Sequence, residues 1–374
     1  IDCNMKVGKS RFGNIFGLKP KVQPTNKIIE ATASNLFDNL VKNYHLDNLF
    51  FYKDPEVGKN FENNYMTQNA YDNEKNLEVA NERFGDEFKI LTPPESGVSA
   101  RYIIQDEALG YNVYAKAEGC NKVDNFNYMY VSYALEDLKM GPRVEFGKNE
   151  VGNITVFSED VQTQGKAFVE NKITDDMLRK YKVKPEMEKI KTIAPIFNLG
   201  DISENKNVAI VEKQDGGCKG QIFDFTIKPD VYFDRNKEKN HFPCTKGTSS
   251  LRKLTERSEG NLNDVCERSF ERTINKVNNL YNTKLDAEIL NIKPNAREKN
   301  ILQDMQNIEN QLNFTLHEGR GGLRDSYNDK IEELHQSIKK RTQDSIPSKT
   351  PEFVKENLYS LMTNKMLIER NIEK

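Results

Sequence analysis

Residues 86–160 alternate short β-type runs with one helical run, and this alternation constrains the fold more than any other feature of the chain. The runs FKIL, ARYII and YNVYAKAEG are rich in β-branched and aromatic residues, and Pro, Gly and Ser or LGY separate them. A helical stretch, FNYMYVSYALEDLK, ends at Gly141-Pro142, and the β-type runs RVEFG and NITVFSE follow it. This order predicts three strands, one helix and two further strands.

The chain before these strands predicts an arm, one helix and a polar linker. Residues 1–25 are basic and rich in Gly and Pro, whereas residues 26–50 carry apolar positions at helical spacing. Residues 53–84 are strongly polar and rich in Asn, which indicates a linker or an irregular insertion.

The chain after these strands predicts a hairpin followed by helices. Residues 172–192 have a charged helical pattern, and VAIVEK and QIFDFTI flank the turn signal Asp215-Gly216-Gly217. Residues 230–253 are polar and basic, which is typical of a loop. Helices with breaks at Gly319–Gly322 and Ile346–Ser348 are expected at 261–283, 294–318, 324–342 and 350–371.

Composition narrows the classes of protein to which the chain can belong. Its 374 residues suffice for two or three domains, and 36% apolar with 30% charged residues indicates a modest core. A net charge of −2 provides no overall basic field for nucleic acid. No apolar run approaches the ~20 residues that span a bilayer, so no transmembrane segment is expected. The five cysteines form no CxxC pair, so we expect free thiols in a reducing compartment.

Three segments carry residues suited to phosphoryl chemistry. Lys116 lies on an apolar strand, where its ammonium must reach a pocket or solvent. In LGDISENKN, Asp201 could orient a hydroxyl, and Asn205 or Asn207 could bind Mg²⁺. Asp224 sits between large apolar residues on a predicted buried strand, where a carboxylate is costly unless a metal or cation partners it. Each segment also has an ordinary interpretation, as a solvent-facing lysine, a pair of turn residues or a strand-end cap.

The order of these segments over residues 85–230 resembles the protein-kinase superfamily: strand lysine, helix, hinge-like strand, Asp…Asn loop, hairpin and Asp-Phe pair. The helix ending in KMGPRVEFG, followed by NITVFSED, is similar to the passage into the hinge of choline-kinase-like and bacterial effector kinases. A narrower resemblance is to the Legionella effector kinase family that is activated by inositol hexakisphosphate.

The resemblance implies an α+β fold with a bilobal kinase-like core. The implied divisions are an N-terminal extension with a helix (1–84), an N-lobe (85–160), a C-lobe core (161–255) and a mainly helical C-terminal region (256–374).

The resemblance also implies a role for each candidate residue. Lys116 would contact the α- and β-phosphates of ATP, and Asp201 would orient the acceptor hydroxyl. Asp224, with Asn207 or Asn205, would hold Mg²⁺ or Mn²⁺. The identity of an acidic partner for the lysine is left open.

The remaining implied nucleotide contacts depart from the family pattern. Gly97 and Ser99 would belong to the phosphate-covering loop, although Gly97 is the single glycine in PPESGVS. Phe157–Asp160, with Glu159, would form the hinge that pairs with adenine. Thr226 stands where the family has the glycine of Asp-Phe-Gly, and the Asp-to-Asn spacing is four or six residues instead of the usual five. A pseudokinase therefore stays open as an alternative.

Basic clusters indicate either solvated surface or a site for a polyanion such as an inositol phosphate or a phosphoinositide headgroup. One cluster contains Arg179, Lys180, Lys182 and Lys184 with Lys189 and Lys191, and a second contains Arg235 and Lys237.

Three hypotheses follow from these patterns. The first is a divergent ATP- and Mg²⁺-dependent kinase that phosphorylates a hydroxyl of a host protein or phosphoinositide. It would be a bacterial effector secreted into a host cell cytoplasm, with an inositol polyphosphate as activator. The second is a non-catalytic kinase-like scaffold whose helical C-terminal half binds a partner. The third is a helical interaction protein with a small sheet domain.

Overall fold

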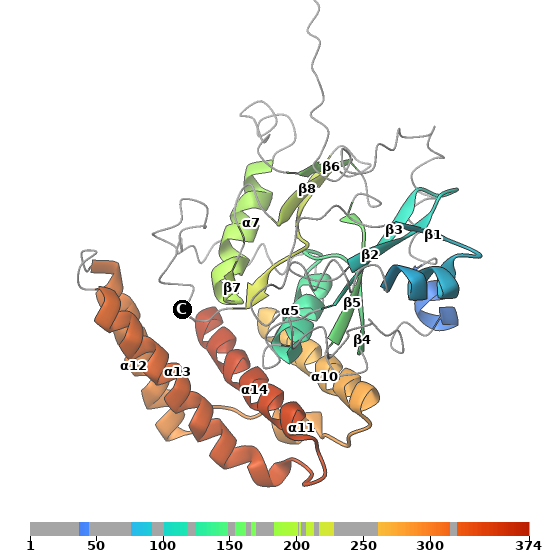
Figure 1. Ribbon diagram of the computed structural model, residues 1–374. Helices are drawn as coiled ribbons and strands as arrows, with labels where there is room; N and C mark the ends of the chain where they lie inside the picture. The colour runs from blue at the N-terminus through green and yellow to red at the C-terminus, as the bar shows by residue number, and fades with distance from the viewer. Residues whose placement is uncertain are drawn as a thin grey trace, which may run out of the picture. The chain divides into compact units, whose positions relative to one another are not determined.

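The fold is known here from a computed structural model (Figure 1), in which the chain separates into two units. The first comprises Ile1–Cys120, Pro142–Glu186 and Val208–Phe223, and the second comprises Asn121–Gly141, Met187–Asn207 and Asp224–Lys374. The structure describes residues 37–44, 76–91, 101–117, 125–148, 154–161, 166–169, 183–200, 202, 207–212, 217–227, 261–314 and 320–373.

A five-stranded antiparallel sheet forms the first unit's main layer, with the order β1-β2-β3-β5-β4. The fourth and fifth strands exchange places relative to their chain order, so β5 pairs with β3 in the interior of the sheet. The strands are β1 (Lys89–Leu91), β2 (Arg101–Asp106), β3 (Tyr111–Ala117), β4 (Val144–Lys148) and β5 (Ile154–Glu159). Every strand of this sheet agrees with a β-type run in the sequence.

One face of the sheet holds a hydrophobic core because alternate side chains of a strand point to the same side. Tyr102, Val113 and Phe157 belong to this core. Helical residues 37–44 and 76–84 add Phe37, Leu40, Ala80 and Phe84 to the core, and both segments lie beside the sheet in Figure 1.

The helix at 76–84 corrects the expectation of a linker over residues 53–84. Ala80 and Phe84 are four residues apart and both are buried, which is the spacing of one helix face. This apolar stripe is short and its flanking sequence is rich in Asn, so the helical pattern is weak in the sequence. Residues 53–75 lie outside the described part of the chain.

A second, three-stranded sheet of the first unit has the order β6-β8-β9. Its strands are β6 (Lys166–Val169), β8 (Val208–Glu212) and β9 (Cys218–Ile222). β8 and β9 form an antiparallel hairpin, as predicted, and Val208 pairs with Ile222 at its open end. The second strand was predicted too late, because β9 overlaps the run QIFDFTI only at Gln221 and Ile222. Ala209 and Val211 form a small core with Val161, against which Phe223 packs.

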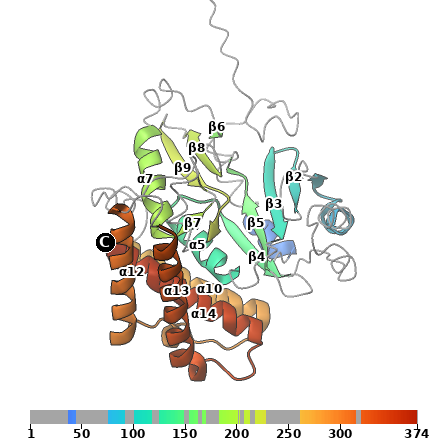
Figure 2. The same cartoon turned by 60° about the vertical axis from the view of Figure 1, so that its left-hand side comes forward.

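The second unit is mainly helical (Figure 2). Its helices are α5 (Asn125–Asp137), most of α7 (Val183–Ile196), α10 (Leu262–Tyr281), α11 (Ala287–Leu290), α12 (Ala296–Phe314), α13 (Arg320–Thr342), the short 3₁₀ turn Gln343–Ser345 and α14 (Glu352–Glu373). It also contains two very short strands that pair antiparallel, β7 (Leu199–Gly200) and β10 (Thr226–Ile227). The mixed α and β fold class and the helical C-terminal region are therefore confirmed.

Helix α5 packs against both α10 and α14. Ten of its residues are buried, so its sequence shows no strong amphipathic face. The acidic residues of α5 lie at its C-terminal end and bind α10: Glu136 accepts from Arg272 at 2.9 Å and Asp137 from Arg268 at 2.6 Å. The guanidinium of Arg272 also lies 3.8 Å from the ring centroid of Tyr133. The helix is thus held by apolar burial along its length and by ion pairs at its end.

Helix α10 begins with a capping box, in which Asn261 and Asp264 each bind the other's backbone amide. It ends at Asn282, whose left-handed φ of 52° lets its amide bond back to the Asn278 carbonyl. The predicted break at Gly319–Gly322 is wrong in part, because α13 already begins at Arg320 and contains Gly321 and Gly322. Glycine is tolerated in a first helical turn at a modest entropic cost.

Cys266 of α10 is a fully buried free thiol, and burial raises its pKa to about 12. Since the thiolate is the reactive form, we expect iodoacetamide at pH 8 to label Cys266 at least about 10³-fold more slowly in the folded chain than in the urea-unfolded chain. Mass spectrometry of timed samples measures both rates. Equal rates in the two states would contradict the burial of this thiol.

Candidate functional site

Lys116 lies on β3 in the interior of the five-stranded sheet, opposite Arg101 of β2 and Val156 of β5. Its side chain is partly buried and engaged in interactions within the protein. Alternation along the strand places it on the same face as Asn112 and Tyr114, away from the core residue Val113. The predicted strand lysine is thus on an interior strand that pairs on both sides.

Polar side chains form a connected row from β2 across β3 to Asp160, the residue after β5. Gln105 Nε2 donates to Asn112 Oδ1 at 2.9 Å, and Asn112 Nδ2 donates to Asp160 Oδ2 at 3.1 Å. The Tyr114 hydroxyl also donates to Asp160, and burial followed by the charge of this carboxylate raises the tyrosine pKa well above its usual value. The sequence signal for this row was the alternation along β3, which places the polar side chains of Asn112 and Tyr114 on the same face as Lys116.

The predicted hinge, Phe157–Asp160, comprises the end of β5 and the residue after it. Phe157 lies in the core on the face opposite to Lys116, and Glu159 is buried. The backbone amide of Glu159 donates to the Arg143 carbonyl at 3.0 Å, and that of Asp160 to the Asn112 carbonyl at 3.0 Å. These two amides are therefore already used within the first unit.

Asn207 and Asp224 flank the open end of the β8–β9 hairpin. Asn207 directly precedes Val208, Asp224 follows Ile222 by two residues, and Val208 pairs with Ile222. Asn207 adopts a left-handed φ of 63°, which asparagine tolerates better than most residues. The hairpin register therefore brings the predicted amide and carboxylate ligands to the same end of one structural element.

Asp224 differs in setting from the expectation of a buried strand residue. β9 ends at Ile222, and Asp224 lies in the bend that leads to β10, with a partly exposed side chain. The strand stops early because the chain must turn to pair Thr226 with Gly200 in the β7–β10 ladder. Asp224 is consequently better placed to bind a ligand than a carboxylate enclosed in a sheet would be.

The β7–β10 ladder pairs the strand that directly precedes Asp201 with the strand that follows Asp224. Gly200 directly precedes Asp201, and its partner Thr226 follows Asp224 by two residues. Between them, Phe225 is buried and stacks on Tyr128 of α5, with ring centroids 4.6 Å apart and an interplanar angle of 20°. The sequence did not indicate Tyr128, because nothing in a helical pattern reveals which loop a ring will meet.

Several predicted residues lie outside the described part of the chain: Gly97, Ser99, Asp201, Asn205, Arg179, Lys180, Lys182, Arg235 and Lys237. Their roles stay predictions. Of the first basic cluster, Lys184 is described and exposed near the start of α7. Lys189 is buried, and Lys191 forms an ion pair with Glu188 at 3.6 Å, so the helical part of this cluster is not a uniform basic face.

Asp224 and Asn207 are the described side chains that were predicted to bind a divalent metal. Among the described residues, no three or more His, Cys, Asp or Glu side chains gather into a group that could hold a metal ion. Mg²⁺ commonly takes one or two protein oxygen ligands and completes its shell with substrate phosphates and water. One carboxylate and one amide at the hairpin end, Asp224 and Asn207, fit that mode of binding, whereas they would not form a metal cage by themselves.

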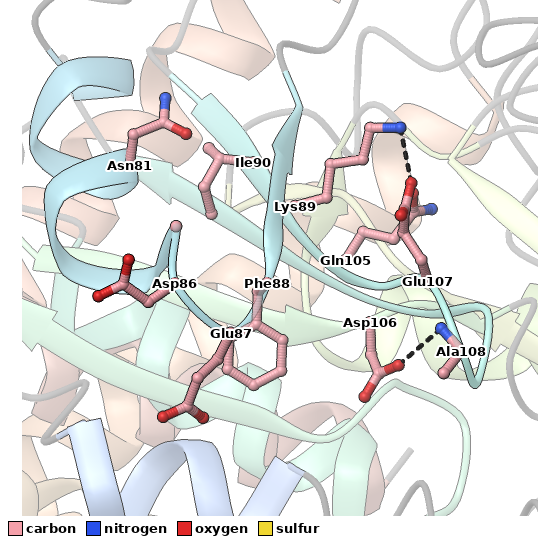
Figure 3. Close-up of a pocket in the computed structure, with 11 residues that line it drawn as sticks. Asn81, Asp86, Glu87, Phe88, Lys89, Ile90, Gln105, Asp106, Glu107 and Ala108 are labelled. Carbon is pink, nitrogen blue, oxygen red and sulfur yellow. Dashed lines mark hydrogen bonds and ion pairs between the residues drawn. The ribbon is translucent and has the colours of Figure 1, made fainter.

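A separate open pocket of about 570 Å³ lies in the first unit (Figure 3). Its acidic groups are largely engaged: Glu107 pairs with Lys89 at 2.7 Å, and Asp106 caps the turn that follows it. Glu87 accepts from the Tyr44 hydroxyl, whose pKa burial and this bond raise to about 12. The lining comes from Asn81 and residues 85–90 and 105–108. It contains none of the predicted site residues, and its excess of carboxylates disfavours phosphate.

None of the described helices is long and apolar enough to cross a membrane. Comparison with models of known protein families, with curated proteins and with solved structures finds no match to the chain.

Proposed function

We propose that the chain is an atypical ATP- and Mg²⁺-dependent kinase that transfers the γ-phosphoryl group to a hydroxyl of a protein or a phosphoinositide. The observation that carries this proposal is the closeness of the candidate residues to paired strand ends. Asn207 directly precedes Val208, and Asp224 follows Ile222, the partner of Val208, by two residues. Gly200, the neighbour of Asp201, pairs with Thr226, which lies two residues after Asp224.

The order of elements along the chain supports the same proposal. Three strands with the lysine on the third, then the helix α5, then two further strands follow in the order that the kinase resemblance implies. Phe225, directly after Asp224, packs on α5 through Tyr128. In protein kinases the packing of the corresponding phenylalanine distinguishes active from inactive states.

Each residue has a distinct chemical task in this proposal. Lys116 binds the α- and β-phosphates, Asp201 orients the attacking hydroxyl, and Asp224 with Asn207 (or Asn205) holds Mg²⁺ or Mn²⁺. The metal, when bound, neutralises charge on the β- and γ-phosphates. Gly97 and Ser99 would cover the phosphates, and the backbone of Phe157–Asp160 would face the base.

The acceptor and regulator are proposed from the basic segments. Clustered lysine and arginine favour multiply charged phosphates, so an inositol polyphosphate such as inositol hexakisphosphate is the proposed activator. Action on a host protein or phosphoinositide after secretion into the host cytoplasm follows from the effector resemblance.

A pseudokinase scaffold is the second candidate, and one observation favours it. Active protein kinases pair the strand lysine with a glutamate of the helix after it. The acidic residues of α5 are Glu136 and Asp137, and α10 binds both through Arg272 and Arg268. In this alternative, the helical C-terminal region serves to bind a partner.

Incubation of the protein with γ-labelled ATP, Mg²⁺ or Mn²⁺, and pools of protein and lipid, with and without inositol polyphosphates, tests the proposal. We expect label transfer together with a rise in melting temperature of at least about 2 °C at saturating nucleotide. Lys116→Met should remove transfer, whereas Lys89→Met, which breaks only an exposed pair with Glu107, should not. Absence of both a shift and transfer in the wild type would exclude the kinase, and a shift without transfer would favour the scaffold.

A further inference from the structure

The β7–β10 ladder needs support from outside itself. Each strand has two residues, and a two-stranded ribbon is marginal in water even when it is longer. Phe225 supplies one support through its stacking on Tyr128. The other end of the ladder begins at Asn198, which directly precedes Leu199 and has a left-handed φ of 53°.

Helix α14 binds the turn at Asn198 from its C-terminal half. Asn371 Nδ2 lies within hydrogen-bond distance of the carbonyl oxygens of Pro195 and Ile196, at 3.3 and 3.2 Å, and of Asn198 Oδ1 at 3.3 Å. Asn198 Nδ2 in turn donates to Asn364 Oδ1 at 3.1 Å. The last carbonyl groups of α7 have no partner within their own helix, so Asn371 caps that helix from a neighbour.

The two asparagines of α14 act from one face of a well-held helix. They are seven residues apart, which is about two helical turns and therefore the same side. Asn198 and Asn364 are both buried, so a lost bond leaves polar groups that water cannot satisfy. Arg370, next to Asn371, binds Glu309 of α12 at 2.7 Å and thereby fixes this end of α14.

We propose that α14 is a positioning element for Asp224: Asn364 and Asn371 hold the turn at Asn198, the turn sets β7, and β7 holds β10 and the segment Asp224-Phe225 through the ladder. The C-terminal helix thus controls the geometry of a metal-binding carboxylate that lies far from it in sequence. The catalytic meaning of this control rests on the proposed kinase function. The coupling between α14 and the ladder is independent of it.

Amide hydrogen exchange tests the coupling without any activity. In Asn371→Ala and Asn364→Ala, exchange of residues 199–200 and 226–227 should rise at least about tenfold, while α10 keeps its protection. Asn198→Gly should have the same effect, because glycine retains the left-handed backbone but lacks the amide. Asn357→Ala is the matched control: Asn357 is a buried asparagine of the same helix, and its amide donates within α14 to the Phe353 carbonyl. The proposal fails if the ladder exchanges no faster in Asn371→Ala than in Asn357→Ala.

Steady-state kinetics then tests the catalytic meaning. In Asn371→Ala, kcat should fall at least tenfold with little change in the KM for ATP, since the proposed coupling acts on Asp224 and not on the phosphate contacts assigned to Lys116. Loss of ladder protection with unchanged kcat would refute positioning. An inactive wild type that binds no nucleotide would refute the proposed function, and the exchange experiment would still decide whether α14 holds the ladder.

Discussion

In the proposed kinase, Asp224→Asn is expected to lower phosphoryl transfer by about 10³-fold or more, while the fold is retained. The substitution keeps the shape of the side chain but removes the negative charge that would bind Mg²⁺. Because the metal would neutralise charge that develops on the transferring phosphoryl group, its loss would act mainly on the transition state. A factor of 10³ corresponds to about 4 kcal/mol of barrier height. The partial exposure of Asp224 and its place in a bend make a large loss of stability unexpected.

The measurement is the initial rate of label transfer, with the free energy of unfolding determined on the same preparations. Asp286→Asn provides the matched control in the same unit. Asp286 caps α11 by accepting from the amides of Glu288 and Ile289, and asparagine is an equally good cap. If Asp224→Asn transferred label at the rate of Asp286→Asn, Asp224 would not be part of the catalytic site. If the wild type also transferred no label, the proposal that the chain is an enzyme would be wrong.

Arg370→Met is expected to destabilise the chain by about 3–5 kcal/mol. Arg370 is 10% exposed, and its guanidinium binds Glu309, which is 5% exposed, at 2.7 Å. It also lies 3.0 Å from the buried Tyr327 hydroxyl, which itself donates to Glu309 at 3.0 Å. Methionine preserves most of the apolar volume but leaves a buried carboxylate without its cation, which accounts for the size of the loss.

Urea unfolding followed by circular dichroism measures this effect. The double variant Arg370→Met with Glu309→Leu should recover a substantial part of the loss, because the uncompensated charge is gone. Lys330→Met is the surface control: Lys330 is partly exposed and pairs at 3.0 Å with the exposed side chains of Asp304 and Glu333, so less than about 1 kcal/mol is expected. If the double variant were no more stable than Arg370→Met, lost packing would explain the effect better than the buried charge.

The sequence predicted those elements whose own residues determine their structure. Alternating apolar residues in YNVYAKA and a stripe including Val265, Phe270 and Val277 defined β3 and α10, since period and burial agree in both. The helix at 76–84 was missed because its apolar stripe is short and its neighbours are rich in Asn. Gly321 and Gly322 were predicted to break the helix but lie in the first turn of α13. A helix start tolerates glycines that would weaken a helix interior.

The candidate site was predictable only in its chemistry. Lys116 and Asp224 could be selected because charged groups on apolar runs need a partner. Their partners could not be selected, because contacts such as Phe225 with Tyr128 join residues about a hundred positions apart and depend on tertiary packing. The same applies to Asn198, whose two side-chain contacts with α14 connect segments that share no local pattern.

The burial of α5 also bears on how such a protein could be switched. In protein kinases the helix after the lysine strand moves outward to disable the enzyme and inward to restore it. Here ten residues of α5 are buried, and its last turn is tied to α10 by Arg268 and Arg272. An outward swing would have to expose this apolar surface and break both ion pairs at once. A regulator of the proposed kinase is therefore expected to leave α5 where it is and to act on the short ladder or on the segments that carry the proposed ligands.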